Sequence, residues 1–299
     1  MLGPSDPQAS TDPLGATMHG ILKHPAFEQS ALHYLDHTLA WRREMGLFNR
    51  VATSAGLYTI GYVLFLHFAN RSGPPEQGAT YSRLLDICEL RNTCGPRALR
   101  TILALAQFMG YLNSVRSSRD KRIQIYTPTE KLVSQTQKQN ATTCACLDRL
   151  VPNANLADQE RADPDFAATL YATSGKAFLD HGIQITEYFP DIDALIKLQA
   201  GCPTLFSVVN AHMRGLPCPS AKTIAKEFHV SSTQVRALLK SAADRGLINM
   251  TERGQVLGAE VLVEQQKAMI ARELALYAKY SFGLENHFVG AGEFSAAHA

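Results

Sequence analysis

The chain has 299 residues, of which 45% are hydrophobic, enough to bury one or two ordinary cores without disulfide or metal staples. Its formal net charge of +2 excludes binding to nucleic acid through overall charge, so only a local gathering of Lys and Arg could serve that purpose. The six cysteines form no CxxC pair and no regular framework, which predicts reduced thiols in a cytosolic protein.

The N-terminal residues 1–25 are rich in Pro, Ser and Gly and lack both the basic start and the apolar run of a secretory signal. This composition predicts a disordered leader. The most apolar stretch, residues 57–68, is interrupted by Gly61 and falls short of the roughly 20 residues that span a bilayer. It is therefore expected to be a buried helix, and no membrane association is expected.

Apolar residues recur at helical spacing over residues 26–48 and again over 51–69. Thr80 is placed to cap a short helix that runs to Leu90. After a turn at residues 91–95, Pro96 fits the first turn of a further helix that runs to about Met109.

Gly110 ends that helix, and two alternating segments follow on either side of a charged bend at residues 117–120. The second alternating segment covers residues 122–126. Helix, turn, helix and β-hairpin is the order of a winged helix-turn-helix unit, so the sequence predicts one here.

A second copy of this order follows a connector with Pro and Asn breakers at residues 141–164. It comprises a helix from Cys202 to Arg214, a helix that Ser220 caps and that runs to Phe228, a turn at 229–231, a helix to Asp244 and the strand-like segment 247–250. Because residues 110–113 correspond to 246–249 at an offset of 136 residues, we interpret the pattern as a duplicated domain. His229 stands where the turn usually has glycine, so it must adopt a positive φ or shift the turn.

The predicted fold is mainly α-helical with small β-hairpin wings, in two tandem winged helix-turn-helix domains joined by helical connectors. The predicted organisation is a disordered leader, a helical arm with the first domain, a helical connector, the second domain with a C-terminal helix at 260–280, and a flexible tail: residues 1–25, 26–140, 141–196, 197–283 and 284–299.

In the first domain, polar residues gather near the start of the second helix, the end that normally enters a major groove. The wing, between Val115 and Ile125, has a higher density of Lys and Arg than the start of this helix, and Asp120 is its only acidic residue. Such a density attracts phosphates and can place an arginine in a narrow minor groove, whereas the plainer alternative is a solvated hairpin tip. Leu105 and Phe108 exceed what one inward face needs, which predicts packing against the 57–68 helix or another subunit.

In the second domain, the outward face of the last helix carries Gln234, Arg236 and Lys240, residue types that read guanine and adenine edges. Two alternatives stay open: Ser231 and Gln234 also fit a capping box, and the cations could form a solvated face. The candidate DNA-binding residues are Arg97, Arg100, Thr101, Arg116, Arg119, Asp120, Lys121, Arg122, Lys222, Ser232, Thr233, Gln234, Arg236, Lys240 and Arg253.

Residues 80–132 resemble the DNA-binding half of the MarR family of bacterial regulators. The resemblance rests on Gly110-Tyr111-Leu112, on Arg119-Asp120-Lys121-Arg122 and on Thr127-x-x-x-Lys131-Leu132. It implies that Arg122 enters the minor groove and that Asp120 orients it. Family members usually carry one winged helix, whereas this sequence predicts two, its second wing at 251–255 has a single arginine, and the match needs one additional residue in the first helix-turn-helix turn.

Other combinations of residues carry less weight. His33 and His37 stand four residues apart but have no evident third metal ligand. Cys94, near a helix N-terminus, could have the lowered pKa of an oxidation sensor, although a structural thiol is the commoner case. No phosphate-binding glycine motif, nucleophile elbow or carboxylate pair supports an enzyme, and no metal or cofactor is expected.

The expected function is a sequence-specific, double-stranded DNA-binding transcription regulator of bacterial type. The sequence allows a homodimer and does not indicate a small-molecule effector. Two alternatives remain: a plasmid-type replication initiator with tandem winged helices, and a protein-interaction scaffold that uses Leu105 and Phe108.

Overall fold

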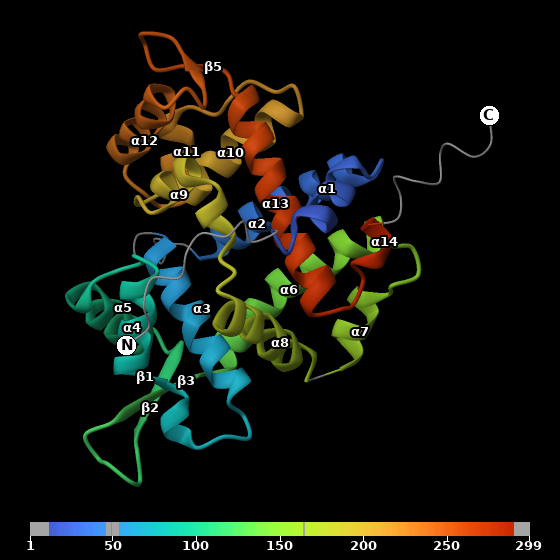
Figure 1. The fold of residues 1–299 in the computed structure, drawn as a ribbon. Helices are drawn as coiled ribbons and strands as arrows, with labels where there is room; N and C mark the ends of the chain where they lie inside the picture. The colour runs from blue at the N-terminus through green and yellow to red at the C-terminus, as the bar shows by residue number, and fades with distance from the viewer. Residues whose placement is uncertain (1–11, 46–48, 50–53, 164, 290–299) are drawn as a thin grey trace, which may run out of the picture.

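The computed structural model describes residues 12–45, 49, 54–163 and 165–289, and it is mainly helical (Figure 1). The principal helices are α1 (Gly15–Lys23), α2 (Phe27–Glu44), α3 (Ser54–Ala69), α4 (Tyr81–Leu90), α5 (Pro96–Phe108), α6 (Glu130–Leu150), α7 (Leu156–Ala162), α8 (Phe166–His181), α9 (Pro190–Ile196), α10 (Gly201–Met213), α11 (Ala221–Glu227), α12 (Ser232–Asp244), α13 (Glu260–Tyr280) and α14 (Asn286–Val289). Short 3-10 turns lie at η2 (Pro75–Gln77) and η3 (Ile185–Tyr188).

Two small antiparallel sheets are present in the described residues. In the first, β1 (Ala79–Thr80) and β2 (Leu112–Arg116) flank β3 (Gln124–Pro128). In the second, β4 (Asn249–Met250) pairs with β5 (Val256–Gly258). We call α3 to β3 the first unit and α10 to β5 the second unit.

The core of the first unit is formed by α3, α4, α5, the three-stranded sheet and α8. The expected buried helix over residues 57–68 is confirmed as part of α3. Gly175 lets α8 approach α3 closely, because a Cβ at this position would lie 2.9 Å from Phe65 Cβ. No helix among the described residues is both long and apolar enough to cross a membrane.

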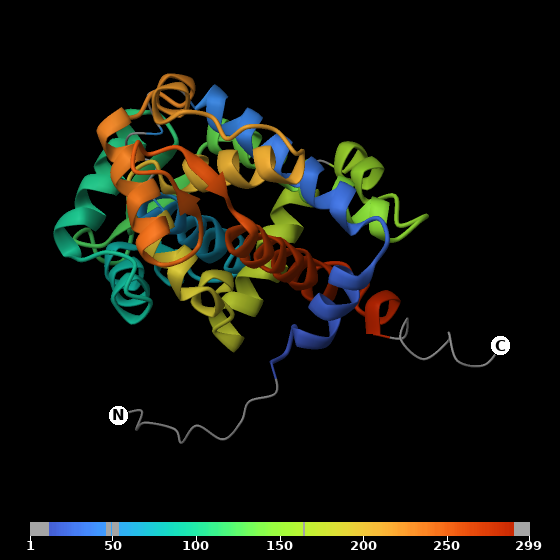
Figure 2. The same cartoon turned by 90° about the horizontal axis from the view of Figure 1, so that it is seen from above.

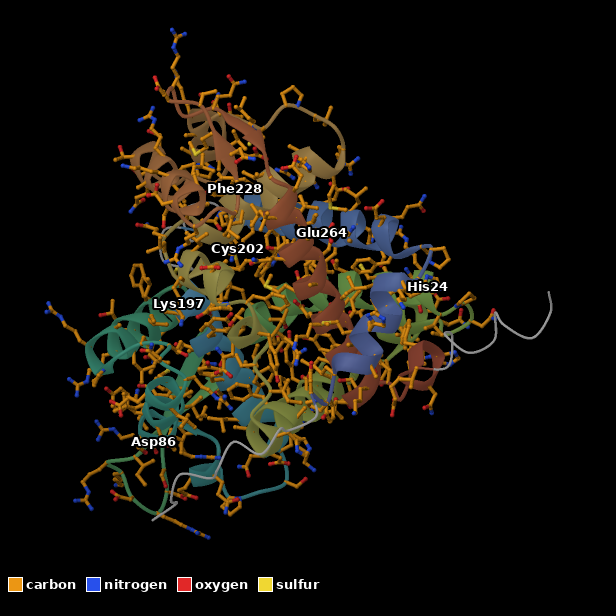
Figure 3. The ribbon with its side chains drawn as sticks, turned by 45° about the horizontal axis from the view of Figure 1, so that its top comes forward. His24, Asp86, Lys197, Cys202, Phe228 and Glu264 are labelled. Atoms are coloured by element: carbon orange, nitrogen blue, oxygen red, sulfur yellow. The ribbon has the colours of Figure 1, made fainter. Side chains whose placement is uncertain are left out.

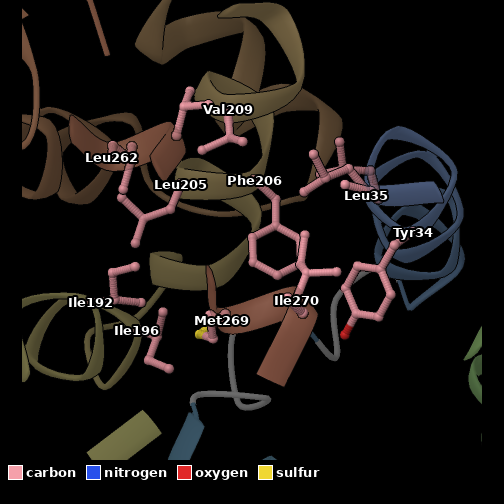
Figure 4. Close-up of a cluster of buried hydrophobic side chains, with 14 of the residues drawn as sticks. Tyr34, Leu35, Ile192, Ile196, Leu205, Phe206, Val209, Leu262, Met269 and Ile270 are labelled. Atoms are coloured by element: carbon pink, nitrogen blue, oxygen red, sulfur yellow. The ribbon is translucent and has the colours of Figure 1, made fainter. Parts of the chain in front are cut away.

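The core of the second unit is larger and also includes helices from the start of the chain. Figure 4 shows Leu205 and Phe206 of α10 beside Leu262 and Ile270 of α13, with Tyr34 of α2 at the edge. The helical arm expected to accompany the first domain, α2, therefore packs into the second core.

One helix, α6, belongs to both cores. Leu132 near its start is buried with the first unit, whereas Cys146 and Leu147 near its end are buried with the second. The expected boundary between residues 140 and 141 falls inside this continuous helix. The predicted connector begins too early at residue 141, because α6 continues to Leu150 and the first breaker, Pro152, lies in the turn after it.

The expected disordered leader over residues 1–25 is wrong for the part of it that the structure describes, residues 12–25. Residues 15–23 form α1, and Leu14 and Ile21 are fully buried. Asp12 accepts two hydrogen bonds from the buried guanidinium of Arg272 on α13, at 2.5 and 2.7 Å. The expected flexible tail likewise contains α14, whose Phe288 is buried, while residues 1–11 and 290–299 lie outside the described residues.

The two units repeat each other closely around α5 and α12. Both helices have 13 residues, and their first residues are 136 apart. Each ends at a glycine with positive φ, Gly110 (71°) and Gly246 (72°). The following amide donates to the equivalent carbonyl, Tyr111 to Ala106 and Leu247 to Ala242. The predicted correspondence between these two segments is thus present in their helix lengths, backbone angles and backbone hydrogen bonds.

The turns before these helices also correspond, but at an offset of 137 residues. Asn92 and His229 both have positive φ, and the next amides donate to Cys88 O and Ala225 O respectively. The expected positive φ of His229 is confirmed at 56°. Since the offset changes by one residue between Thr93 and Pro96, the first turn contains one additional residue, Cys94 or Gly95, and Gly95 is the N-cap that corresponds to Ser231.

We expect Gly175→Ala to lower the free energy of unfolding by about 1–3 kcal/mol, because the new methyl group must displace Phe65 in a packed helix crossing. Gly61→Ala is the matched control, since Gly61 also lies within a helix and a Cβ there meets nothing within 4 Å. It should stabilise the chain by up to about 1 kcal/mol. Urea denaturation of both variants measures the difference, and equal effects would contradict the close approach.

Candidate nucleic-acid interface

The residues of α5 that are buried in the core determine which of its residues face solvent. Leu99, Leu103 and Ala106 are buried in the first core, and this leaves Arg97, Arg100 and Thr101 exposed. Gly95 caps the helix start without a side-chain hydrogen bond, and Pro96 occupies its first turn as expected. The helix thus presents two arginines from its N-terminal half to solvent.

Tyr81, the first residue of α4, contacts both the first residue of α5 and the side chain of Arg100. Its hydroxyl donates to Pro96 O at 3.2 Å, and its ring lies 5.5 Å from the Arg100 guanidinium carbon. The side-chain hydroxyl of Thr80 caps α4 by accepting from Arg83 N, which confirms the expected cap. The cap fixes the helix end that carries Tyr81.

We define the first hairpin as β2, β3 and the connecting residues 117–123. Ser114 on β2 accepts hydrogen bonds from Gln107 of α5 at 2.8 Å and from Gln124 of β3 at 2.7 Å. These two bonds hold the hairpin against α5. Arg116, Arg119, Lys121 and Arg122 are exposed on it.

The tip of the first hairpin is built around Ser117, whose exposed fraction is only 3%. Its hydroxyl donates to Glu76 Oε1 at 2.5 Å and accepts from the amides of Arg119 and Asp120. The hydrogen bond from Ser117 lowers the pKa of Glu76. The exposed cations therefore stand on a folded tip and not on a loose loop.

Asp120 and Arg122 form a two-point ion pair on the tip. Arg122 Nε and one terminal nitrogen lie 3.1 and 3.2 Å from the two carboxylate oxygens, and the Arg122 amide donates to the same carboxylate at 2.9 Å. Hydrogen bonds from Arg122 lower the pKa of Asp120. The Arg122 side chain is still 92% exposed, so the pair orients a guanidinium that remains open to solvent.

Arg100 and Arg122 line the same cleft. Its volume is about 480 Å³, and it lies between the start of α4, the exposed face of α5 and the strand β3 with its preceding tip. The lining residues are Thr80, Tyr81, Ser82, Arg100, Arg122, Ile123, Gln124 and Tyr126. The fold thus brings two candidate residues that are 22 positions apart in the sequence onto the walls of one open, basic concavity.

In the second unit, Arg236 occupies the position of α12 that corresponds to Arg100 in α5, at the same offset of 136 residues. Thr233, Arg236 and Lys240 are exposed, Ser232 is half-buried, and Lys222 is exposed on α11. Gln234 is half-buried and donates to the side chain of Gln199. The alternative of a capping box is wrong, because Ser231 makes no side-chain hydrogen bond at the helix start.

The second hairpin, β4 and β5 with residues 251–255, is shorter than the first. Arg253 is exposed at its turn, where Gly254 has φ of 81°. Thr251 N donates to Gln255 O at 2.8 Å. This hairpin displays one cation where the first displays four.

Figures 1 and 2, which differ by a right-angle turn, both place α5 and α12 on the same side of the molecule. In Figure 3, Asp86 of α4 and Phe228 after α11 mark the two units at opposite ends. The candidate residues therefore form two separate groups, one per unit, and the structure does not bring them into a single cluster.

Three features of this surface were missed or misjudged from the sequence. Glu76 and Tyr81 position the hairpin tip and Arg100, but neither follows a periodic pattern that would single it out. The expected packing of Phe108 on the 57–68 helix is wrong, because its side chain is 88% exposed in this chain, whereas packing against another subunit stays a prediction. Among the described residues, no group of three or more His, Cys, Asp or Glu side chains is placed to hold a metal ion.

Comparison of the chain with protein-family models, with curated proteins and with solved structures found no match.

We expect Ser117→Ala to loosen the tip of the first hairpin, because it removes the acceptor of two amides and the donor to Glu76. Hydrogen exchange at the Arg119 and Asp120 amides should become about fivefold to tenfold faster, as the loss of about 1 kcal/mol per hydrogen bond implies. Ser118→Ala, at the exposed neighbour, should leave the exchange unchanged. Unchanged exchange in both variants would show that Ser117 does not hold the tip.

Proposed function

We propose that the chain binds double-stranded DNA through two winged helix-turn-helix units and acts as a sequence-specific transcription regulator. The observation that carries the proposal is the basic cleft with Arg100 on one wall and Arg122 on the other. Strand, helix, turn, helix and hairpin in the first unit follow the order of a winged helix, with β1 as the third strand of the sheet. The second unit repeats the helix, turn, helix and hairpin.

The two walls of the cleft suit different parts of a duplex. Arg100 and Arg97 project from the N-terminal half of α5, the part of a recognition helix that meets base edges, and arginine binds guanine bidentately. Arg122 projects from a hairpin tip, where an exposed guanidinium suits phosphates and a narrow minor groove. Base contacts then specify the sequence, and backbone contacts set affinity and register.

The pairing of Asp120 with Arg122 supports the resemblance of residues 80–132 to the MarR family. That resemblance implies an aspartate that orients a minor-groove arginine, and the observed two-point ion pair is suited to this role. An arginine fixed in advance loses less rotamer entropy on binding.

Because α5 and α12 lie on the same side of a single chain, the two units would read a quasi-palindromic site, with α5 at one half-site and α12 at the other. A homodimer would read a longer site. The correspondence of Arg100 with Arg236 supports equivalent roles for these arginines in the two half-sites.

We expect Arg122→Ala to weaken binding to all duplexes and to reduce the salt dependence of log Kd by about one ion, because it removes a phosphate contact. Arg236→Ala should instead relax base preference by about 1–3 kcal/mol at one position. Selection from a random duplex pool, followed by fluorescence anisotropy at several salt concentrations, measures both effects.

Arg161→Ala is the control for these variants, since Arg161 is an exposed arginine on α7 that pairs with Asp158 and lies outside both units. It should change neither affinity nor preference. Equal, sequence-independent losses from Arg122→Ala and Arg236→Ala would contradict the division of roles, and absence of duplex binding at low salt would contradict the proposed function.

The exposed Phe108 supports a second candidate, a protein-interaction scaffold. On DNA, Phe108 would instead contact a thymine methyl group, an apolar contact that major-groove readers use. We expect Phe108→Ala to weaken binding to the selected duplex about fourfold, as burial of one methyl group at about 0.8 kcal/mol implies. On a duplex in which uracil replaces thymine, Phe108→Ala and the parent chain should bind with equal affinity. Equal binding of both proteins to both duplexes would exclude the thymine contact of Phe108.

A further inference from the structure

Two thiols lie together at the turn between α4 and α5. Cys88, in the last turn of α4, is fully buried, and Cys94, in the turn, is half-buried. The sulfur of each lies 3.9 Å from the same atom, Thr59 Oγ1. The amide of Thr93 donates to Cys88 O at 2.8 Å, and this bond folds the turn back so that the next residue, Cys94, faces the end of α4.

This pair is specific to the first unit. When the ends of α4 and α11 are matched, Cys88 corresponds to Ala225 and Thr93 to Val230, since both amides make the same backbone bond. The next residue of the second unit is the N-cap Ser231, which corresponds to Gly95. Cys94 is therefore the additional residue of the first turn, and it is placed against a second thiol.

The surroundings of Cys94 favour its thiolate. Hydrogen bonding from Cys88 lowers the pKa of Cys94 to about 7, although burial acts in the opposite direction. The same pair interaction, together with burial, raises the pKa of Cys88. Cys94 also lies two residues before the start of the 13-residue helix α5, whose N-terminal amides stabilise negative charge. The sulfur of the half-buried Cys94 is thus the nucleophile, and the sulfur of the fully buried Cys88 stays protonated beside it.

We propose that Cys94 and Cys88 form an oxidation site that reacts with hydroperoxides and closes to a disulfide. The Cys94 thiolate attacks one peroxide oxygen, the O–O bond breaks, and the released alkoxide or hydroxide takes up a proton, which leaves Cys94 as a sulfenic acid. The Cys88 sulfur then loses its proton and attacks the Cys94 sulfur. The S–O bond breaks, hydroxide leaves with that proton as water, and the two sulfurs have given two electrons to the peroxide.

The consequence for DNA rests on the proposed function. A disulfide fixes the two sulfurs at about 2.05 Å, so the turn that carries Cys94 must close onto the end of α4. Gly95, Pro96 and Arg97 follow Cys94 in the chain, so the start of α5 must move with it. We expect oxidation to weaken binding of the selected duplex about tenfold, the size of one lost bidentate base contact.

Trypsin separates the two cysteines, because Arg91 lies between them and Arg83 and Arg97 flank them. The full reduced chain is treated with hydrogen peroxide, its remaining thiols are alkylated, and the digest is analysed by mass spectrometry. We expect peptides 84–91 and 92–97 to be joined and to separate on reduction. Their recovery as separate alkylated peptides, or Cys88 or Cys94 joined to another cysteine, would overturn the proposal.

Two variants test which cysteines form the disulfide. Cys94→Ser should abolish the joined peptide and leave Cys88 alkylated after unfolding, whereas Cys218→Ser should leave the joined peptide unchanged, because burial raises the pKa of Cys218 to about 11. Loss of the joined peptide in Cys218→Ser would count against the pair. The parent digest decides the proposal even if Cys94→Ser does not fold.

Duplex binding before and after peroxide separates the two proposals. A joined peptide in a chain that binds no duplex even when reduced would overturn the proposed function and support the oxidation site. A joined peptide with unchanged duplex affinity would overturn the effect on α5, and reduction with dithiothreitol should restore affinity if that effect is real.

Discussion

The arrangement of the two units depends on one continuous helix with its ends in different cores. Leu132 of α6 is buried with the first unit and Leu147 with the second, and the helix between them keeps them about 22 Å apart. Between them, Asn140 accepts a buried hydrogen bond from Tyr171 of α8 at 3.2 Å, which ties the middle of α6 to the helix packed on α3. Because a packed helix resists bending, α6 holds the two units in place, and Figures 1 and 2 show α5 and α12 on one side of the molecule.

Side-chain hydrogen bonds, partly buried or exposed, position the exposed cations of the first unit. Ser114 joins α5 to both strands of the hairpin, and Ser117 joins the hairpin tip to Glu76. Neither serine would bind DNA in our proposal, yet both determine where Arg122 stands relative to Arg100. With a net charge of only +2, the chain has no overall attraction to phosphate, so the DNA binding that we propose would depend on holding a few cations in place.

Sequence rules succeeded where local chemistry decides the structure. Thr80 and Ser220 cap the helices expected of them, and Gly110 and Gly246 end theirs in the left-handed region, which glycine adopts without strain. They failed where distant partners decide it. Residues 15–23 form a helix whose partners are distant in the sequence: Leu14 and Ile21 are buried in the second core, and Asp12 binds Arg272, 260 residues away. Glu76 likewise acts through a residue 41 positions later. For the candidate site, charge and spacing indicated the arginines, but only the fold brought Arg100 and Arg122 to one cleft.

The repeat makes the differences between the units interpretable. Arg100 and Arg236 share a position, whereas the first unit alone has the four-cation hairpin and the Cys88 and Cys94 pair. When two linked units bind one duplex, the second binds at the high effective concentration set by the first, so loss of either contact removes that gain for the whole chain. A chemical change confined to one turn of the first unit can therefore act on the complete complex. The second unit, with Ala225 in place of Cys88, would keep its own base preference and hold the chain weakly on half of the site.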